Sequence, residues 1–324
     1  MSKRVKVAFA GAGGIADTHM SLLRTMDDVQ IVAIADIVQQ KAESLASRYM
    51  ARAYTDYRQM LANEEMDALY VCVPPYAHEE QEILAAAKGV HLFVEKPVAL
   101  TLKKALEVRD AIKKKSIISS VGYHWRYQDN TDKARNILAG RKIGLVNGYW
   151  LSGMPEVSWW RRLDKSGGQI VEQAGHIIDL ARYICGEIVE VYAAYTRQTF
   201  ELSSEEDIYD FGSIVMKFAS GAVGTMVNTC VLSLPYTVGL HVVCSDTVVE
   251  LHGDLTVMER GHKEILSGGR NPILMENEAF INAVRTGDSS GIRSDYEDAV
   301  KTLAVSLACN ESADANSPIA IGGV

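Results

Sequence analysis

A glycine-rich turn near the start of the chain limits the possible folds more than any other feature. Gly11–Ala16 (Gly-Ala-Gly-Gly-Ile-Ala) follows the apolar run Lys6–Ala10 and precedes a helical pattern. The turn fits the spacing G-x-G-x-x-G/A, in which the first glycine permits a tight turn and the second lets a phosphate approach the backbone. The small third residue allows close packing of helix and strand, and the helix N-terminus attracts an anion. This pattern predicts a βαβ unit that binds a dinucleotide.

Short apolar runs alternate with helical patterns up to about residue 122. Buried runs such as Ile31–Ala35 are typical of parallel strands covered on both faces. Alternating strands and helices predict an α/β domain with a doubly wound, Rossmann-type sheet over residues 1–122. We expect strands at Lys6–Ala10, Ile31–Asp36, Ala68–Val73, His91–Glu95 and Ile117–Val121, and helices that include His78–Lys88 and Leu102–Lys115.

The pattern changes after Tyr123. One long helix is expected at Gln169–Cys185, and strands then follow one another without helices between them, which predicts antiparallel pairing. Residues 123–324 are therefore expected to form an α+β domain with an open, largely antiparallel sheet. The expected strands are Val189–Thr196, Phe211–Ala219, Ala222–Cys230 and Val238–Cys244, with a hairpin turn at Ser220–Gly221.

Composition narrows the classes of function. A length of 324 residues suggests two domains, and a net charge of -8 without a basic face argues against a nucleic-acid partner. The five cysteines show no C-x-x-C spacing, which favours free, buried thiols in a reducing cytosol. We find no signal peptide and no apolar run long enough to cross a membrane, so a cytoplasmic protein without a membrane partner is expected.

Asp36 ends the second expected strand, after the glycine-rich turn. An acid at this distance can bind the two adenosine ribose hydroxyls of a dinucleotide. It would repel a 2′-phosphate, and no arginine follows in Ile37–Gln40. The pattern therefore favours NAD over NADP. The alternative is an aspartate that only caps the next turn.

Two further strand ends carry unusual residues. Ligands of doubly wound sheets bind at the carboxyl ends of strands, where this chain has the segment Val73–His78 and the motif Glu95-Lys96-Pro97. Pro97 restricts Lys96 to an extended backbone and permits a cis peptide. Lys96 is either a cation directed at a substrate oxygen or part of a surface region in which Glu95 forms a salt bridge. Position alone does not separate the two.

The expected helix Gln169–Cys185 carries a polar stripe. Glu172, His176 and Asp179 are four and three residues apart and so lie on one side. A histidine beside a carboxylate suits general-base chemistry. The alternatives are a solvated helix face or metal ligands, but two carboxylates and one imidazole on one helix do not complete a metal site, so no metal is expected.

Together these motifs resemble the Gfo/Idh/MocA family of glucose-fructose oxidoreductases and inositol dehydrogenases, over nearly the whole chain and in the same order. The resemblance implies hydride transfer between NAD and a sugar, inositol or related cyclic polyol, by a homodimer or homotetramer built on the second sheet. It also implies that Lys96 contacts the reacting hydroxyl and that His176 is the general acid/base. Glu172 stands where inositol dehydrogenases have an aspartate.

Further binding residues follow from the resemblance. Arg126 lies in a domain crossover where a family arginine is near the cofactor, and Asp179 matches a further family acid. Trp160 lies in a stretch that lines the pocket in relatives, and its face suits either a sugar or the core. The expected catalytic residues are Lys96, His176 and Glu172; the cofactor-binding residues are Gly11, Gly13, Gly14, Ile15, Asp36, Pro74, His78, Glu95, Lys96 and Arg126; and the substrate-binding residues are Lys96, Trp160, Glu172, His176 and Asp179.

Two alternative functions stay open. One is an enzyme of the same family, a glycosidase or epimerase, that uses tightly bound NAD for transient oxidation and reduction. The other is a non-catalytic sensor loaded with NAD. A sensor would be expected to lose the reactive lysine or histidine, whereas this chain has both Lys96 and His176.

Overall fold

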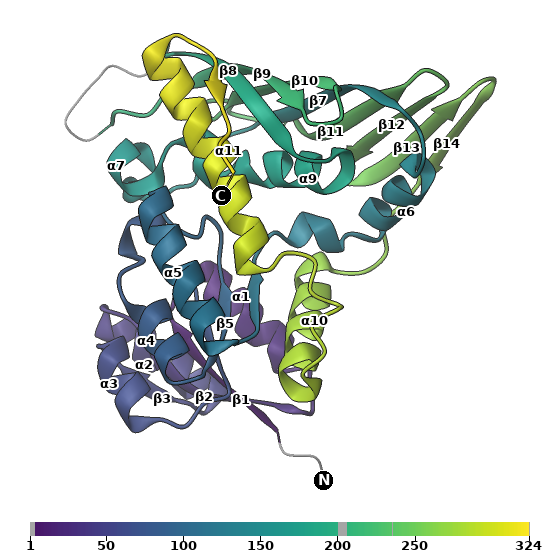
Figure 1. Cartoon of the computed structure of the whole chain (residues 1–324). Helices are drawn as coiled ribbons and strands as arrows, with labels where there is room; N and C mark the ends of the chain where they lie inside the picture. The colour runs from purple at the N-terminus through teal and green to yellow at the C-terminus, as the bar shows by residue number, and fades with distance from the viewer. Residues whose placement is uncertain (1–3, 200–205, 235, 324) are drawn as a thin grey trace. The chain divides into compact units, whose positions relative to one another are not determined.

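The computed structural model describes residues 4–199, 206–234 and 236–323, which form two compact units (Figure 1). Unit 1 contains the chain up to Ala99 together with Lys103–His124 and Asn271–Ala299, and unit 2 contains the remainder. This differs from the expected single break after residue 122, because Asn271–Ala299 was expected in the second half. The reason is that helix α10 (Pro272–Thr286) places Phe280 and Ile281 in the hydrophobic core of unit 1.

The sheet of unit 1 is fully parallel, with the strand order β3-β2-β1-β4-β5-β6. This confirms the Rossmann-type prediction. The order reverses between β1 and β4, which makes the carboxyl ends of these two strands the expected ligand-binding edge. The strands are β1 Val5–Ala10, β2 Val29–Ala35, β3 Arg52–Tyr54, β4 Ala68–Val71, β5 His91–Val94 and β6 Ser119–Val121.

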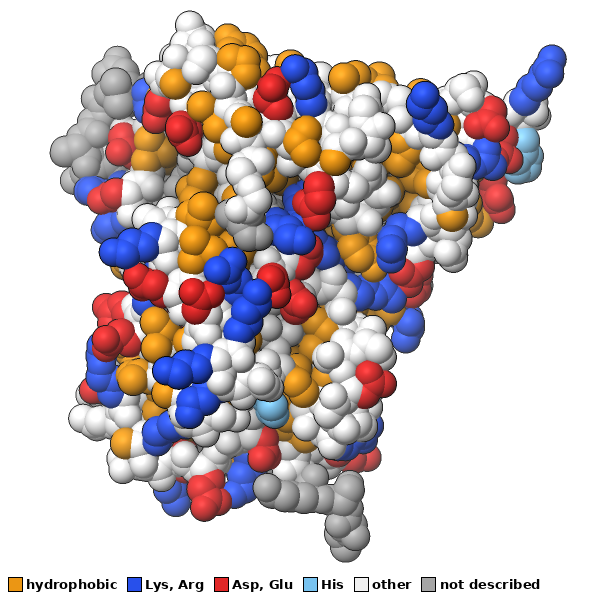
Figure 2. Space-filling view, in the orientation of Figure 1, with side chains coloured by type: hydrophobic (Ala, Val, Ile, Leu, Met, Phe, Trp, Pro, Cys, Tyr) orange, Lys and Arg blue, Asp and Glu red, His pale blue; other side chains and the backbone are white. Residues whose placement is uncertain are grey.

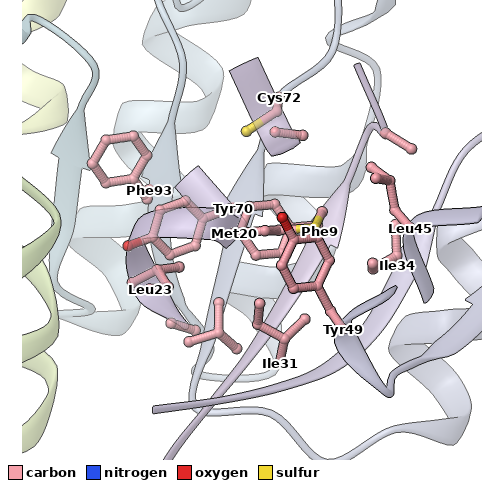
Figure 3. Packing of buried hydrophobic residues seen from close by; sticks show 14 of the residues in the cluster. Phe9, Met20, Leu23, Ile31, Ile34, Leu45, Tyr49, Tyr70, Cys72 and Phe93 are labelled. Atoms are coloured by element: carbon pink, nitrogen blue, oxygen red, sulfur yellow. The ribbon is translucent and has the colours of Figure 1, made fainter. Parts of the chain in front are cut away.

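An aromatic stack holds the centre of this sheet together (Figure 3). The ring of Tyr70 lies 4.8 Å from that of Phe9 and 4.6 Å from that of Phe93, so it joins β1, β4 and β5. The expected helix His78–Lys88 is shorter than predicted, because a 3-10 turn, η1 (Pro75–Ala77), comes first and α4 begins only at Gln81. The helices of this unit also include α1 Gly14–Leu23, α2 Gln39–Tyr49, α3 Tyr57–Asn63, α4 Gln81–Ala87 and α5 Leu102–Lys115.

The sheet of unit 2 has the order β14-β13-β12-β11-β7-β10-β9-β8-β15. It is largely antiparallel, as predicted, and the hairpin turn at Gly221 is confirmed. The prediction missed the central strand β7, which pairs parallel to β10. The strands are β7 Ile143–Leu151, β8 Ile188–Thr196, β9 Phe211–Phe218, β10 Val223–Thr229, β11 Thr237–Cys244, β12 Thr247–His252, β13 Asp254–Glu259, β14 His262–Leu266 and β15 Ile319–Ala320.

The single long helix expected at Gln169–Cys185 is wrong. Helix α8 (Gln169–Glu172) ends before α9 (Gly175–Cys185) begins. The regular ladder is interrupted because the N–H of Ala174 donates to the carbonyl of Gln169, and that of His176 donates to Gln173. His176 therefore stands in the first turn of α9. The remaining elements of the second half are η2 His124–Tyr127, α6 Asp129–Leu138, η3 Ser158–Arg161, α7 Leu163–Ser166 and α11 Tyr296–Ala315.

One face of the unit 2 sheet packs against α9, and the other carries exposed apolar side chains. On β7 a side chain at Gly148 would meet Ile177 of α9, so Gly148 faces the helix. Leu145 is three residues away in the same strand and therefore points to the opposite face. There Leu145 pairs with Val223, and Tyr192 pairs with Val215. These four side chains are between 37% and 48% exposed.

Charged side chains of both signs are interspersed over the surface seen in Figure 2. Among the described residues, no helix has the length and apolar character needed to cross a membrane. All five cysteines are buried and free.

Candidate active site

The glycine-rich turn joins the ends of three strands. Gly11 follows β1 with a φ of 101°, and a Cβ there would lie 2.2 Å from the carbonyl oxygen of Cys72, just beyond β4. The N–H of Gly11 donates to the carbonyl of Ala35 at the end of β2, at 2.8 Å. Because any side chain would collide with the backbone beyond β4, this position requires glycine.

The start of α1 offers open space for an anion. A Cβ added at Gly13 or Gly14 would meet no atom within 4 Å. Gly13 caps α1 without a side chain, so no side-chain cap occupies the first N–H groups of the helix. Ala16 is fully buried in the core, and Ile15 is 37% exposed. These residues fit the pyrophosphate of a dinucleotide.

Asp36 lies directly beside this turn. One carboxylate oxygen accepts a hydrogen bond from the N–H of Ala12, and the other accepts from the N–H of Val38, each at 2.8 Å. Asp36 thus caps the turn that follows β2 and also orders the glycine-rich turn. The capping role considered for Asp36 is thus present in the structure, and its binding of the ribose hydroxyls stays a prediction.

Lys96 follows β5, and its peptide bond to Pro97 is cis. Its backbone N–H donates to Oε2 of Glu95 at 3.1 Å. Oε1 of Glu95 lies 2.9 Å from Nε2 of the buried His19. A Cβ at Gly122 would lie 2.5 Å from the Glu95 carboxylate, so the glycine leaves room for it.

The Glu95 side chain is only 8% exposed. Its carboxylate is directed to His19 and to the Lys96 backbone, and contact of Glu95 with the cofactor stays a prediction. Burial alone would raise the pKa of Glu95, but the hydrogen bond with His19 and the charges of His19 and Lys96 bring it below its usual value. Glu95 is thus a carboxylate that holds the backbone of Lys96.

His124 is a neighbour of Lys96 that the sequence analysis did not assign. Burial lowers the pKa of His124 to about 4, with the Lys96 charge acting in the same direction and Glu95 opposing it. His124 is therefore neutral near pH 7. The sequence does contain a pattern that points to His124, because His124 comes shortly after the end of β6, as Lys96 comes shortly after the end of β5.

The other strand-end segment has a different role from the expected one. The ring of His78 is 8% exposed, and its Nδ1 pairs with Oε1 of Glu82 in α4. Binding of the cofactor by the His78 side chain stays a prediction. Pro74 precedes η1 and is partly exposed.

In unit 2, His176 is 4% exposed and stacks on Trp150 of β7, with ring centroids 6.0 Å apart and an angle of 13° between the planes. The carboxylate of Glu172 accepts a hydrogen bond from the indole N–H of Trp160 at 2.6 Å. Trp150 was missed because β7 itself was not predicted.

Trp160 is fully buried in a cluster with Ile208 and Cys230. In this structure Trp160 is a core residue that orients Glu172, as one of its two expected roles required, and its contact with a sugar stays a prediction.

Asp179 and Arg126 bind each other. Both carboxylate oxygens of Asp179 accept from the Arg126 guanidinium at 2.6 Å, and Oδ1 also accepts from Thr302 at 2.8 Å. The two side chains are 0% and 3% exposed. The buried pair occupies these groups in this structure, and the expected contacts of Asp179 with substrate and of Arg126 with cofactor stay predictions.

Comparison with known proteins identifies the family. Residues 5–123 match the model described as an oxidoreductase family with an NAD-binding Rossmann fold, and residues 132–253 match the Gfo/Idh/MocA C-terminal domain. The chain belongs to the Gfo/Idh/MocA family. It is an NAD-dependent oxidoreductase of this family, and unit 1 contains its NAD-binding domain.

Curated relatives include sugar and polyol dehydrogenases. The chain is 26% identical to myo-inositol 2-dehydrogenase of Thermotoga maritima, over 95% of this chain and 96% of the relative. It is 29% identical to D-glucoside 3-dehydrogenase of Escherichia coli, over 57% of this chain and 55% of the relative.

Solved structures share the fold. A levoglucosan dehydrogenase in complex with NADH and levoglucosan superposes with a TM-score of 0.88 at 20% identity, covering 99% of this chain and 100% of that one. The WlbA dehydrogenase of Bordetella pertussis, in complex with NADH and UDP-GlcNAcA, gives 0.86 at 20% identity, again covering 99% and 100%.

Proposed function

We propose that this protein is a dehydrogenase that oxidises a ring hydroxyl of a sugar, inositol or related cyclic polyol with NAD. The observation that carries the proposal is Lys96, a cation at the end of β5 whose backbone is held by the buried Glu95 carboxylate. The names of the relatives, which act on myo-inositol and on a D-glucoside, support this class of substrate.

The cofactor is held by backbone and carboxylate groups of unit 1. When NAD binds, Gly13, Gly14 and the first N–H groups of α1 would hold the pyrophosphate, and Asp36 would accept hydrogen bonds from the adenosine ribose. NAD, when bound, supplies the hydride acceptor.

Lys96 stabilises negative charge on the substrate oxygen. Its ammonium group donates to the hydroxyl as that group loses its proton, and this interaction strengthens as the alkoxide develops. The neutral His124 lies near enough for Lys96 to affect its pKa, yet adds no competing positive charge.

His176 takes the hydroxyl proton as a neutral imidazole. Stacking on Trp150 fixes the plane of its ring. Glu172, held by Trp160, orients His176 or binds a neighbouring substrate hydroxyl.

A substrate panel tests the proposal. Inositols, aldoses, uronic acids and nucleotide sugars are each incubated with NAD, and reduced cofactor is followed by its absorbance. We expect turnover on at least one cyclic polyol or sugar, and a loss of about 100- to 10,000-fold in His176→Ala. NAD that copurifies with the protein, together with substrate conversion but no accumulation of NADH, would instead support transient oxidation by a glycosidase or epimerase.

A further inference from the structure

Three ionisable side chains meet inside unit 1. They are His19 of α1, Glu95 after β5 and Glu276 of α10, and one ligand atom from each lies within 4.8 Å of the other two. Their exposed fractions are 0%, 6% and 0%. They come from segments far apart in the sequence, so the cluster exists only in the folded unit.

Glu276 lacks a partner within the described part of the chain. Both of its carboxylate oxygens are buried, and neither has a hydrogen bond. An unpaired carboxyl group in the protein interior is strongly unfavourable, and native structures pair such groups with donors, cations or water. The nearby Glu95 carboxylate adds repulsion, so this position calls for a positive charge.

His19 has the hydrogen bonding of a metal ligand. Its Nδ1 lies 3.0 Å from Oδ1 of Asn277, an oxygen that also accepts from the Tyr70 hydroxyl at 2.9 Å. An amide oxygen only accepts, so Nδ1 carries a hydrogen and Nε2 is the ring nitrogen that faces Glu95. Histidines that bind metals commonly donate their second N–H to an oxygen in this way.

The remaining contact is a hydrogen bond whose proton a metal ion can replace. Nε2 of His19 and Oε1 of Glu95 are 2.9 Å apart. Two atoms bound to one zinc ion at about 2.0–2.2 Å lie roughly 3–4 Å from each other, so a small outward movement of these side chains admits an ion.

We propose that His19, Glu95 and Glu276 bind one divalent transition-metal ion, with Zn²⁺ the best match to this ligand set. One imidazole and two carboxylates suit zinc, and two negative charges neutralise the ion. The ion ties α1 and α10 to the end of β5, where the second oxygen of Glu95 holds the Lys96 N–H. The role is structural and goes beyond the proposed dehydrogenation. These three ligands come from separate segments of the chain, unlike the side chains of the Glu172–Asp179 stripe, for which no metal was expected.

Metal content, thermal stability and cobalt spectra test the site on the full-length protein. After treatment with a chelator and dialysis, the protein is titrated with Zn²⁺, or with Co²⁺ as a spectroscopic probe. We expect close to one ion per chain, visible bands from Co²⁺ with nitrogen and oxygen ligands, and a Tm rise of about 5 °C at free Zn²⁺ roughly 100-fold above its Kd.

Two matched variants locate the ion. Glu276→Gln removes one ligand without changing its size and should weaken Zn²⁺ binding at least about 10-fold and abolish the Tm rise. Glu278→Gln makes the same change at an exposed position of α10 and should bind like the unaltered protein. Circular dichroism confirms that each variant is folded, and the Co²⁺ spectrum of the unaltered protein is informative even if Glu276→Gln fails to fold.

Two outcomes would overturn the proposal. In one, Zn²⁺ and Co²⁺ leave the Tm unchanged and Glu276→Gln is at least as stable as the parent; the occupant is then a proton on Glu276, whose pKa is raised by burial and by Glu95. In the other, zinc binding survives Glu276→Gln and is lost in His252→Asn, which places the ion at the exposed His241–His252 pair.

Discussion

The guanidinium of Arg126 and the carboxylate of Asp179 form a buried pair with two N–O distances of 2.6 Å. Arg126 lies in η2 and Asp179 lies in α9, so the pair fixes the helix that begins with the His176 turn. The Arg126–Asp179 pair lies in unit 2 and has almost no exposed surface. Substitutions of the two residues therefore show how strongly the pair holds α9 in place.

Arg126→Met should destabilise unit 2 strongly. Removing one partner leaves a buried, uncompensated charge, which typically costs about 3–5 kcal/mol of the free energy of unfolding. The double variant Arg126→Met, Asp179→Leu should recover much of the loss, because neither charge remains. Lys301→Met removes a half-exposed partner of Glu187 and should cost about 1 kcal/mol or less. Denaturant unfolding followed by circular dichroism measures all three, and equal effects of the two single changes would contradict this account.

Sequence patterns predicted the parts of the fold that depend on local signals. The turn at Gly11 and the apolar runs that become β1, β2, β4 and β5 were found because each strand is buried over most of its length. Strand β3 was missed because its three residues are largely exposed at the sheet edge.

The side-chain contacts that the sequence did not reveal join residues that are far apart along the chain. The aromatic stack of His176 on Trp150 needs β7 beside α9, and the pairing of Asp179 with Arg126 spans 53 residues. An acid on a helix face looks the same in sequence whether it meets solvent, substrate or a buried arginine. Burial and pairing decided between these roles.

Asp36 should set the cofactor preference. Asp36→Ala is expected to raise the Kd for NAD by about 10-fold or more, because hydrogen bonds to a charged group contribute about 1.5–3 kcal/mol. Binding of NADP should change little, since the substitution also removes repulsion of the 2′-phosphate. Asp56→Ala, which removes a helix cap elsewhere in unit 1, is the control and should leave both affinities unchanged. Titration with each cofactor is the measurement, and a parent protein that prefers NADP would refute the assignment.

Lys96 should matter for turnover and not for cofactor affinity. Lys96→Met removes the cation that stabilises the developing alkoxide, and the loss of one such donor typically lowers kcat about 100- to 1,000-fold. The Kd for NAD should stay near its original value because Asp36 and the Gly11 turn are intact. Lys103→Met, at an exposed position of α5, is the matched control. Near-normal turnover in Lys96→Met would show that the proposed site is wrong.

His124 should make the protein less stable in acid. Its pKa of about 4 in the folded state lies below the value of about 6.5 expected in the unfolded chain. As pH falls, the unfolded chain therefore takes up a proton on His124 before the folded chain does. The free energy of unfolding is unaffected by the titration of His124 above about pH 6.5 and decreases between about pH 6.5 and pH 4. The loss is up to about 3 kcal/mol.

The check for His124 is the free energy of unfolding at pH 7 and at pH 4.5. His124→Gln should show a smaller difference between the two than the parent, whereas His262→Gln, at an exposed position, should match the parent. An unchanged pH dependence in His124→Gln would rule out this residue as its source.

The exposed face of the unit 2 sheet should be a subunit interface. Leu145, Val223, Val215 and Tyr192 form neighbouring cross-strand pairs there, and an exposed apolar face of a sheet commonly marks an association surface. We expect a dimer or tetramer by light scattering at micromolar concentration. Val215→Lys should shift the distribution towards the monomer, and Val157→Lys, at an exposed position outside the sheet, should not. A monomeric parent protein would contradict the prediction.

The return of helix α10 to unit 1 has a consequence for biosynthesis. A ribosome has completed nearly all of unit 2 before Phe280 and Ile281 emerge to close the first hydrophobic core. Until then the strands of unit 1 exist without part of their cover, and a fragment ending near His124 would leave apolar surface exposed to water. The nucleotide-binding unit is therefore first in sequence, yet its core cannot close until most of the chain has been made.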